Sequence, residues 1–273
     1  MLLPSRTTSR GAAMVLQPRT FPLAAMPAAV LAAATLMLAG CGGSGSQPKS
    51  VTLTAAPSQP PASASPAATA PAATTPPATT TGKPSQAPPT GYQWVGISAQ
   101  HIWLAVPRTW VVLNLSSLTV TQALDRVRLK GQPATTMRTA IEGLKKNHGL
   151  MVLDTASIAT SPEKFATNLN TFCTTSPIEP GPGAATTIAS GTKTAYTKAG
   201  GHVVSVHVLT DTASSVIVRI AVNLQTTTGE TAHELQYVDV TGPGEICYTT
   251  FTTDRPAKFF PVFAKVATTI QVG

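Results

Sequence analysis

Few side chains in this sequence have the type and spacing that catalysis requires. Ser161 and Lys164 are three residues apart, and a lysine one helical turn beyond a serine can activate its hydroxyl as a nucleophile. The same serine, followed by Pro162, is also typical of a helix start, where the hydroxyl caps the first turn. The 11 carboxylates are too scattered to nominate an acid–base pair. We therefore predict a helix cap at Ser161 and no catalytic residue.

The five histidines form no metal-binding pattern. His202 and His207 are five residues apart on a predicted strand, and strand side chains alternate in direction, so we expect them on opposite faces. His101, His148 and His233 lie near the ends of predicted elements. The folded part also contains no phosphate-binding loop or dinucleotide fingerprint. The sequence predicts no metal and no cofactor.

The N-terminal segment has the organisation of a secretory signal. Three arginines and no acidic residue precede an apolar run over residues 21–38. Leu38, Ala39 and Gly40 lie directly before Cys41, and this tetrapeptide resembles the lipobox of bacterial lipoproteins. The resemblance implies that a signal peptidase recognises those three residues and removes residues 1–40. It also implies that Cys41 carries a diacylglyceryl thioether.

The alternative for this segment is an uncleaved transmembrane anchor, because 18 residues reach the lower end of spanning length. Pro22 and Pro27 interrupt the run, and much of it is alanine. Both interpretations place the rest of the chain on the extracytoplasmic side of the bacterial cell membrane. We predict the lipid anchor, which makes the membrane one partner of the protein.

Residues 41–90 are predicted to be a disordered linker after the lipidated cysteine. Eleven prolines lie between residues 42 and 90, mostly among Ala, Ser and Thr, and only Lys49 and Lys83 are charged. Such a segment buries too little apolar surface to offset its ordering entropy, so we expect an extended tether. The same composition is typical of O-glycosylated stalks, so a bare and a glycosylated linker remain alternatives.

Residues 91–273 are predicted to form one globular domain, large enough for a core of its own. Its 14 basic and 11 acidic residues leave a small net charge without a basic run, so we predict no nucleic-acid partner. Once Cys41 is lipidated, Cys173 and Cys247 remain in an oxidising compartment. We favour a disulfide between them over two buried thiols.

Apolar periodicity predicts an α+β domain with an antiparallel meander. The predicted strands lie within residues 92–114 (101–106 and 110–114) and over 150–154, 168–175, 203–209, 216–224, 235–240 and 245–252. Helices are predicted from Pro133 to about 146, weakly over 184–198, and from near Pro261, because two prolines do not fit one helix interior. Two or three helices would cover one side of the sheet and leave its other face wet.

A family resemblance follows from short motifs and from the order of elements. The residues that carry it are Val106-Pro107-Arg108-Thr109-Trp110, the run over 165–170 and an aromatic C-terminal helix. Together they resemble the LpqN/LpqT group of actinobacterial lipoproteins, which are similar in fold to the PsbP-like domains of photosystem II extrinsic proteins. The resemblance covers most of residues 92–272. It implies a PsbP-like fold and a non-enzymatic binding or accessory module, and assigns no functional residue beyond Cys41.

Three tryptophans lie close together in the first predicted strands. Packing in the core explains them, and a stacking platform for a sugar or an apolar groove is the alternative. On the strand over 101–106, Trp103 shares a face with His101 and Ala105. His101 and Trp103 therefore mark a possible ligand face.

These observations favour a membrane-anchored cell-envelope module that is not an enzyme and that binds an unknown envelope protein, glycan or lipid. One alternative is a carrier that holds a lipid or glycolipid in an apolar cavity between sheet and helix. A second is a hydrolase of cell-wall or lipid ester bonds that uses Ser161.

Overall fold

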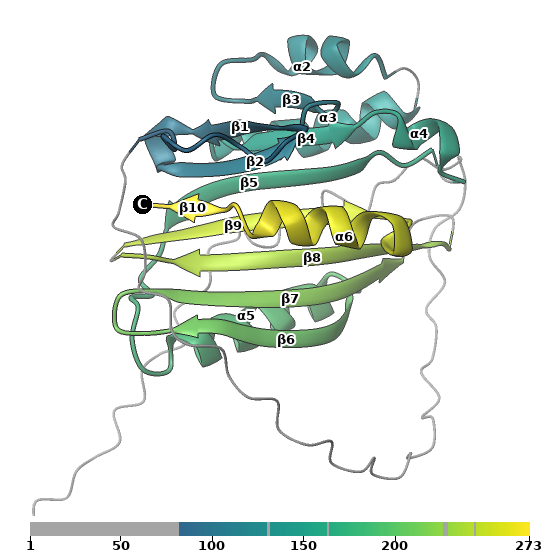
Figure 1. Cartoon of the computed structure of the whole chain (residues 1–273). Helices are drawn as coiled ribbons and strands as arrows, with labels where there is room; N and C mark the ends of the chain where they lie inside the picture. Colours follow the sequence, from purple (N-terminus) through teal and green to yellow (C-terminus); the bar gives the residue numbers. More distant parts are fainter. Residues whose placement is uncertain (1–81, 130–131, 163, 226–228, 243) are drawn as a thin grey trace, which may run out of the picture.

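The computed structural model describes residues 82–273, apart from 130–131, 163, 226–228 and 243 (Figure 1). The predicted signal segment, the lipidation at Cys41 and the linker up to residue 81 lie outside the described residues. None of the described helices combines the length and the apolarity that crossing a membrane requires.

A seven-stranded antiparallel sheet with the order β3-β4-β5-β9-β8-β7-β6 forms the centre of the domain. Its strands are β3 (Val111–Asn114), β4 (Leu150–Asp154), β5 (Thr167–Thr175), β6 (His202–Asp211), β7 (Val216–Gln225), β8 (Thr231–Val240) and β9 (Glu245–Thr253). The strands β6 to β9 follow one another along the chain and in space, so the predicted meander is confirmed. A smaller antiparallel sheet contains β1 (Tyr92–Ile97), β2 (Ile102–Pro107) and β10 (Gln271–Val272).

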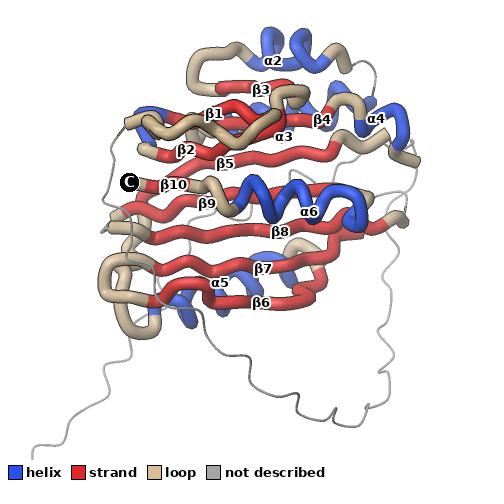
Figure 2. The backbone as a smooth tube through the Cα atoms, viewed as in Figure 1, coloured by secondary structure: helices blue, strands red, loops and turns tan. Residues whose placement is uncertain are grey.

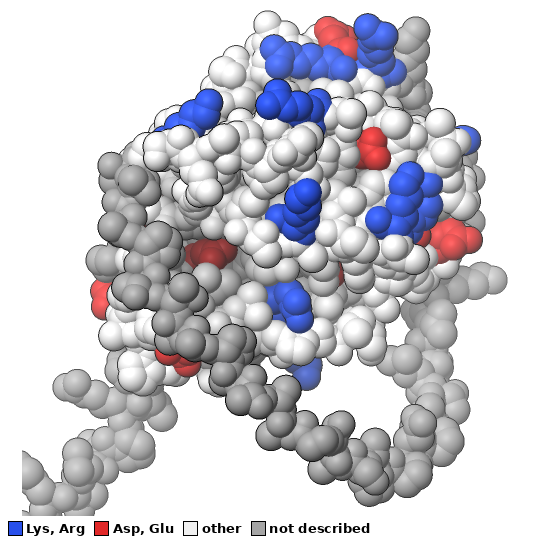
Figure 3. Space-filling view, in the orientation of Figure 1, with Lys and Arg blue, Asp and Glu red and all other residues white. Residues whose placement is uncertain are grey.

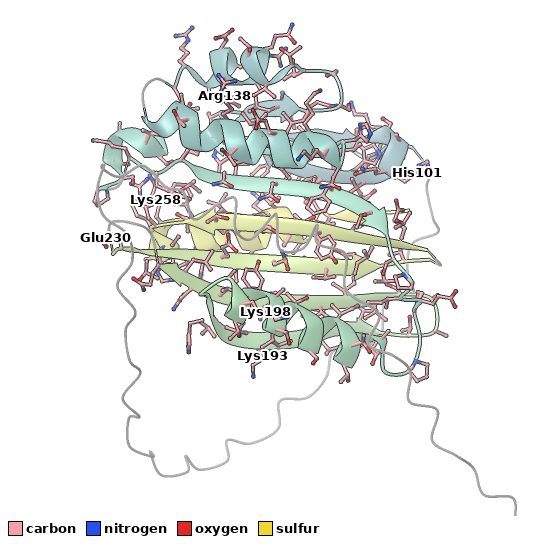
Figure 4. The ribbon with its side chains drawn as sticks, turned by 180° about the vertical axis from the view of Figure 1, so that it is seen from behind. His101, Arg138, Lys193, Lys198, Glu230 and Lys258 are labelled. Carbon is pink, nitrogen blue, oxygen red and sulfur yellow. A yellow bond between two sulfur atoms is a disulfide. The ribbon has the colours of Figure 1, made fainter. Side chains whose placement is uncertain are left out.

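The described helices lie on both faces of the large sheet. They are α2 (Val120–Val127), α3 (Gln132–Lys146), α4 (Ser157–Thr160), α5 (Ala184–Lys198) and α6 (Pro256–Ala267). Helices α3 and α5 lie on one face, which we call the α3/α5 face (Figure 4). On the other, the α6 face, β1 and β2 lie over β4 and β5 while α6 lies over β9 (Figure 2). The α+β class is confirmed.

Both faces of the large sheet are covered by other elements, which differs from the prediction that one face stays in contact with water. Strand β4 shows why. Leu150 and Val152 pack into the core on the α6 face, whereas Met151 and Leu153 pack into the core on the α3/α5 face. A strand that is apolar on both sides has to be buried on both sides. The two layers of cover therefore follow from the sequence of β4 itself.

Helix α6 begins at Pro256, five residues before the predicted start, and Pro261 lies inside it. Pro256 occupies the first turn, where a missing N–H costs nothing. Pro261 cannot donate to the carbonyl of Ala257, but both residues face the outside of the helix, so water can reach that carbonyl. Burial of Phe259 and Phe263 on the opposite side then holds the helix together.

Two elements at the start of the domain were not predicted. Helix α2 follows a capping box in which the Gln122 N–H donates to Thr119 Oγ1 (3.1 Å) and the Thr119 N–H donates to Gln122 Oε1 (2.9 Å). That pair of residues was a readable start signal. In addition, residues 92–114 form three strands rather than two, because β1 pairs along its whole length with β2.

Candidate functional site

The strands β5, β9 and β8 carry polar side chains at the centre of the α3/α5 face. The strand register places these side chains in two rows of three, because residues two apart on a strand share a face. The rows are Asn168, Thr252, Glu234 and Asn170, Thr250, Gln236. We call these six residues the central polar patch. Each is at most 2% exposed, and strand spacing gives the patch an extent of about 10 Å by 7 Å.

Apolar side chains border the central polar patch on every side. The rows continue into Met151 and Leu153 on β4, and into Ile220 and Val222 on β7. The ends of the patch are bordered by Phe172, Tyr248 and Val238 on one side and by Ala166 and Ala232 on the other. The patch is therefore a polar island inside the apolar core that α3 and α5 help to form.

Hydrogen bonds within the patch use only part of its capacity. Gln236 Nε2 donates to Thr250 Oγ1 (3.0 Å), and Thr252 Oγ1 donates to Glu234 Oε1 (3.2 Å). Asn168 Nδ2 donates to the carbonyl of Ala166 (2.9 Å). The atoms left buried without a partner are Asn168 Oδ1, Asn170 Oδ1 and Nδ2, Gln236 Oε1 and Glu234 Oε2. Each such atom lowers the stability of the fold by about 1–3 kcal/mol. The patch is therefore destabilising unless a further molecule supplies the missing hydrogen bonds.

Tyr196 on α5 faces Glu234 across the edge of the patch. Burial raises the pKa of Glu234 to about 7, while contacts with Tyr196 and Thr252 oppose that rise. Burial and the nearby Glu234 carboxylate raise the pKa of Tyr196 well above its ordinary value. Neither the Tyr196 hydroxyl nor Glu234 Oε2 has a hydrogen-bond partner of ordinary geometry. A side-chain hydrogen bond between the two groups nevertheless contributes to both pKa shifts, so Tyr196 and Glu234 are polar partners of each other.

Figure 4 shows where the patch lies relative to the helices. Arg138 marks α3, and Lys193 and Lys198 mark α5. The strands β9 and β8 run between these two helices, and α5 packs on β6 and β7. Thr192, one turn before Tyr196 on α5, is also buried with its hydroxyl unpartnered.

Cys173 and Cys247 form a disulfide, as predicted, with a sulfur–sulfur distance of 2.00 Å. They are direct partners on β5 and β9 and face the α6 side of the sheet. Glu245 brings a carboxylate oxygen within 4.8 Å of both sulfurs, the one such grouping found in the described chain. Sulfurs bonded to each other are not the thiolates that a metal requires, so this form does not offer a metal site.

The predicted ligand face at His101 and Trp103 lies on the small sheet. Trp103 covers Gly96 on β1, where a Cβ would come within 2.6 Å of the indole ring, and the Trp103 indole nitrogen is buried without a partner. His101 precedes β2 in a left-handed turn (φ 49°), so it is not part of the strand that carries Trp103. Ligand binding at these two residues stays a prediction.

The other two tryptophans lie in different surroundings. Trp94 shares the outer face of the small sheet with Trp103, and its indole N–H donates to the Gln86 carbonyl (2.7 Å). The end of the predicted linker therefore contacts the domain. Trp110 is in the core, with its ring centroid 6.5 Å from both Phe259 and Phe263, which agrees with the packing interpretation.

Ser161 does not start a helix, so the predicted cap is wrong. It follows the last residue of α4, and Lys164 takes a left-handed backbone conformation (φ 52°) that prevents a helix from continuing after Pro162. Ser161 Oγ accepts from the Phe165 N–H (2.8 Å) and donates to Asp254 Oδ2 (2.5 Å). This buried serine joins the loop after α4 to the residue that follows β9.

The prediction that His202 and His207 face opposite sides of their strand is also wrong. Their partners on β7 are Asn223 and Arg219, which are four residues apart and share a face. A β-bulge between Val203 and Ser205 adds one residue to β6 and restores the same direction. Because about 13 Å of strand separates the two histidines, they still do not approach a common metal.

Charged side chains do not gather into a single patch of one sign on the α6 face (Figure 3). Lys and Arg side chains lie over α6 and the region above it, with Asp and Glu side chains among them (Figure 3).

The sequence matches no protein-family model and no curated protein. Among solved structures, the chain is similar to the cyanobacterial PsbP protein (CyanoP) of Synechocystis sp. PCC 6803, with 13% identity and a TM-score of 0.43, over 70% of this chain and 98% of that one. A protein of Bacteroides thetaiotaomicron VPI-5482 is similar with 10% identity and a TM-score of 0.34, over 63% of this chain and 45% of that one. Similarity at this level assigns no function, and the LpqN/LpqT resemblance stays a prediction.

Proposed function

We propose that this protein is an extracytoplasmic ligand-binding module, anchored to the cell envelope through a lipid on Cys41, with the central polar patch as its binding site. The observation that carries the proposal is the set of buried polar atoms without partners on β5, β8 and β9. Buried polar groups in folded proteins are normally satisfied, and apolar side chains at the same positions would give a more stable core. A ligand that completes these hydrogen bonds explains their presence.

The proposed role is binding rather than catalysis. The patch consists of amide and hydroxyl groups around one carboxylate, Glu234, and the neighbouring Tyr196 is the other titratable group at the site. Such groups fix the orientation of a ligand. The hydrolase alternative depends on Ser161, whose hydroxyl is buried and bonded to Asp254. An accessory or binding module is therefore the function that the geometry favours.

The disulfide supports the extracytoplasmic part of the proposal, because disulfides persist mainly in oxidising compartments. The anchor is tested by the mass of the N-terminal peptide of the mature protein, which should begin at a diacylglyceryl-modified Cys41. A Cys41→Ala variant should leave the detergent phase, whereas a Cys173→Ala variant should remain in it. Equal partitioning of the Cys41→Ala variant and the unaltered protein would refute the lipid anchor.

The apolar border of the patch favours a second candidate, a carrier of a lipid or glycolipid. A ligand with a polar head and an apolar chain would place the head against the amides and the chain against residues such as Met151, Ile220 and Phe172. The two candidates differ in what accompanies the protein during purification. Native mass spectrometry would show a lipid-sized adduct on a carrier.

The binding site is tested by one pair of variants of the whole chain in mild detergent. Asn170→Ala removes the amide whose two polar atoms are both unpartnered, and Thr186→Ala changes an exposed residue of α5. Isothermal titration with envelope glycans, lipids and small polar metabolites should find a ligand whose affinity falls at least tenfold in Asn170→Ala and is unchanged in Thr186→Ala. Binding that ignores the Asn170 change would contradict the site.

A further inference from the structure

The exposed large apolar side chains of the described chain all lie on β6. They are Val204, Val208 and Leu209, and each is 50–55% exposed. The strand β6 is the last of the large sheet, so its outer edge pairs with no other strand of the described chain. Single apolar side chains are ordinary on a protein surface, but three on one free strand edge mark a candidate interaction surface. We call these three residues the apolar β6 edge.

Two β-bulges shape this edge against the addition of a further strand. The ladder between β6 and β7 skips Val204 and Leu209, which are therefore the extra residues of the two bulges. Between them, residues 205–208 keep regular pairing. Bulges bend an edge strand and are one of the devices that prevent association between strand edges. The partner of the apolar β6 edge should therefore contact its side chains rather than extend the sheet.

Basic side chains lie on both sides of the apolar β6 edge. Lys193 and Lys198 are exposed on α5, which packs on β6 (Figure 4). Arg219 on β7 is the cross-strand partner of His207 and lies on the opposite face of the sheet. Asp211, at the end of β6, is the acidic residue of that strand. Apolar side chains within a basic border are the combination that binds the surface of an anionic bilayer.

We propose that the apolar β6 edge docks the folded domain on the surface of an anionic lipid bilayer. Its three side chains lie between the lipid headgroups, while Lys193 and Lys198 contact lipid phosphates. The backbone of β6 stays at headgroup depth, where water and headgroups satisfy its outer N–H and C=O groups. This inference goes beyond the central polar patch. It takes from the proposed function only that a lipid on Cys41 keeps the chain near a membrane.

The size of the apolar β6 edge favours a bilayer over a second copy of the chain. Three half-exposed aliphatic side chains offer far less than the roughly 800 Å² that each partner buries in a stable protein–protein interface. A tethered domain needs much less contact, because docking onto the membrane that already holds the chain is intramolecular. The lipid then retains the protein, and the apolar β6 edge sets the orientation of the domain.

The test places one fluorescent label on the apolar β6 edge of the whole lipidated protein. The proposed lipid blocks Cys41, and Cys173 and Cys247 are bonded to each other, so a cysteine introduced by Val204→Cys can be labelled alone. A matched label at Glu142→Cys lies on the exposed side of α3, which is far from β6 across the sheet (Figure 4). On vesicles of equal parts phosphatidylglycerol and phosphatidylcholine, we expect an aqueous quencher to reach the Val204→Cys label about fivefold less well than the Glu142→Cys label. On phosphatidylcholine vesicles the difference should shrink.

Two sets of substitutions in the labelled protein separate the apolar and the basic contributions. Leu209→Ser removes one apolar contact and should increase quenching of the label on the β6 edge. Lys193→Gln with Lys198→Gln removes two basic contacts and should increase it too, with an effect that added salt reduces. Arg138→Gln with Lys146→Gln removes two charges from α3 and should leave the quenching unchanged. All of these side chains are exposed, and circular dichroism checks that the fold is retained.

The remaining outcomes separate this inference from the proposed anchor. Equal quenching of the Val204→Cys and Glu142→Cys labels on anionic vesicles would overturn the inference. Protection of the Val204→Cys label that increases with protein concentration in the absence of vesicles would also overturn it, because a second copy would then be the occupant. If mass analysis found Cys41 unmodified, the anchor alone would be refuted. The Val204→Cys label, in a chain that also carries Cys41→Ala, should then still be protected by an excess of anionic vesicles, and its full exposure there would overturn the docking as well.

Discussion

The two faces of the strand pair β5 and β9 differ in whether their buried polar side chains have hydrogen-bond partners. On the α6 face, the hydroxyls of Thr171 and Thr249 bond each other at 2.9 Å, and the hydroxyl pair nearer the end of β9 has the same distance. On the α3/α5 face, one residue away along the same strands, both polar atoms of the Asn170 amide lack a partner. On β5 and β9 themselves, polar groups are buried on both faces, so on this strand pair the unused hydrogen-bonding capacity of Asn168 and Asn170 is what distinguishes the α3/α5 face.

The largest expected effect comes from cutting the covalent link on the α6 face. The disulfide joins residues 74 apart, and closing a loop of that length should stabilise the fold by about 4 kcal/mol in the chain-entropy model. We expect the Cys173→Ala, Cys247→Ala double variant to lose that much free energy of unfolding, measured by urea denaturation with tryptophan fluorescence. A Cys41→Ala variant is the matched control. A loss below about 1 kcal/mol would show that β5 and β9 are held by their ladder alone.

The next effect concerns the two buried carboxylates, one on each face. Burial raises the pKa of Glu234 from 4.5 and that of Asp239 from 3.8, each to about 7. The folded protein therefore retains protons that the unfolded chain has released, and the free energy of unfolding decreases as pH rises from about 4 through 7. Glu234 should account for about 3 kcal/mol of that decrease.

Two substitutions apportion this pH dependence between the faces. Glu234→Gln should remove the part of the pH-dependent stability loss that comes from the α3/α5 face. Asp239→Asn should remove the part that comes from the α6 face. Glu142→Gln on the exposed side of α3 is the control and should leave the curve unchanged. Urea denaturation between pH 4 and pH 8 provides the measurement. A stability that rises with pH in the unaltered protein would contradict the assigned direction of both pKa shifts.

A third prediction is that removing an unsatisfied group on the α3/α5 face stabilises the protein. Asn170→Leu replaces a buried amide without partners by an apolar side chain of similar size, so the free energy of unfolding should increase by about 1–2 kcal/mol. Ligand binding should be lost in the same variant, since stability at a site is often exchanged for function. A destabilised Asn170→Leu protein would indicate that the amide has a structural role in the fold.

Local patterns predicted most elements of the fold, because the strands of the meander and helix α3 each carry a clear apolar period. The strand β7 shows this best, since Val216, Val218, Ile220 and Val222 all point into one core. The helix α6 was placed wrongly because the rule against internal proline considers the backbone alone. Burial of two phenylalanines outweighs one missing hydrogen bond that faces solvent.

The central polar patch was not predicted, although all of its residues except Glu234, which directly precedes the predicted strand over 235–240, stood in predicted strands. Asn168 and Asn170 alternate in the segment that becomes β5, and this spacing puts both on one face. What the sequence does not contain is the neighbour of β5, because β9 lies about 75 residues further along the chain and joins it through long-range pairing. The two asparagines become part of a candidate site only because β9 pairs with β5 and β8 pairs with β9. This pairing places Glu234 and Gln236 on the same face, one strand beyond β9.

The smallest expected effect tests the satisfied face directly. Thr171→Val leaves the Thr249 hydroxyl buried without its partner, which should cost about 1 kcal/mol of unfolding free energy. Adding Thr249→Val removes the orphaned group as well, so the double variant should return to within about 0.5 kcal/mol of the unaltered protein. Urea denaturation of the four proteins gives the coupling energy. If the losses of unfolding free energy in Thr171→Val and Thr249→Val simply added in the double variant, the two hydroxyls would not satisfy each other. The contrast with the unpartnered amide of Asn170 on the α3/α5 face would then lose its physical basis.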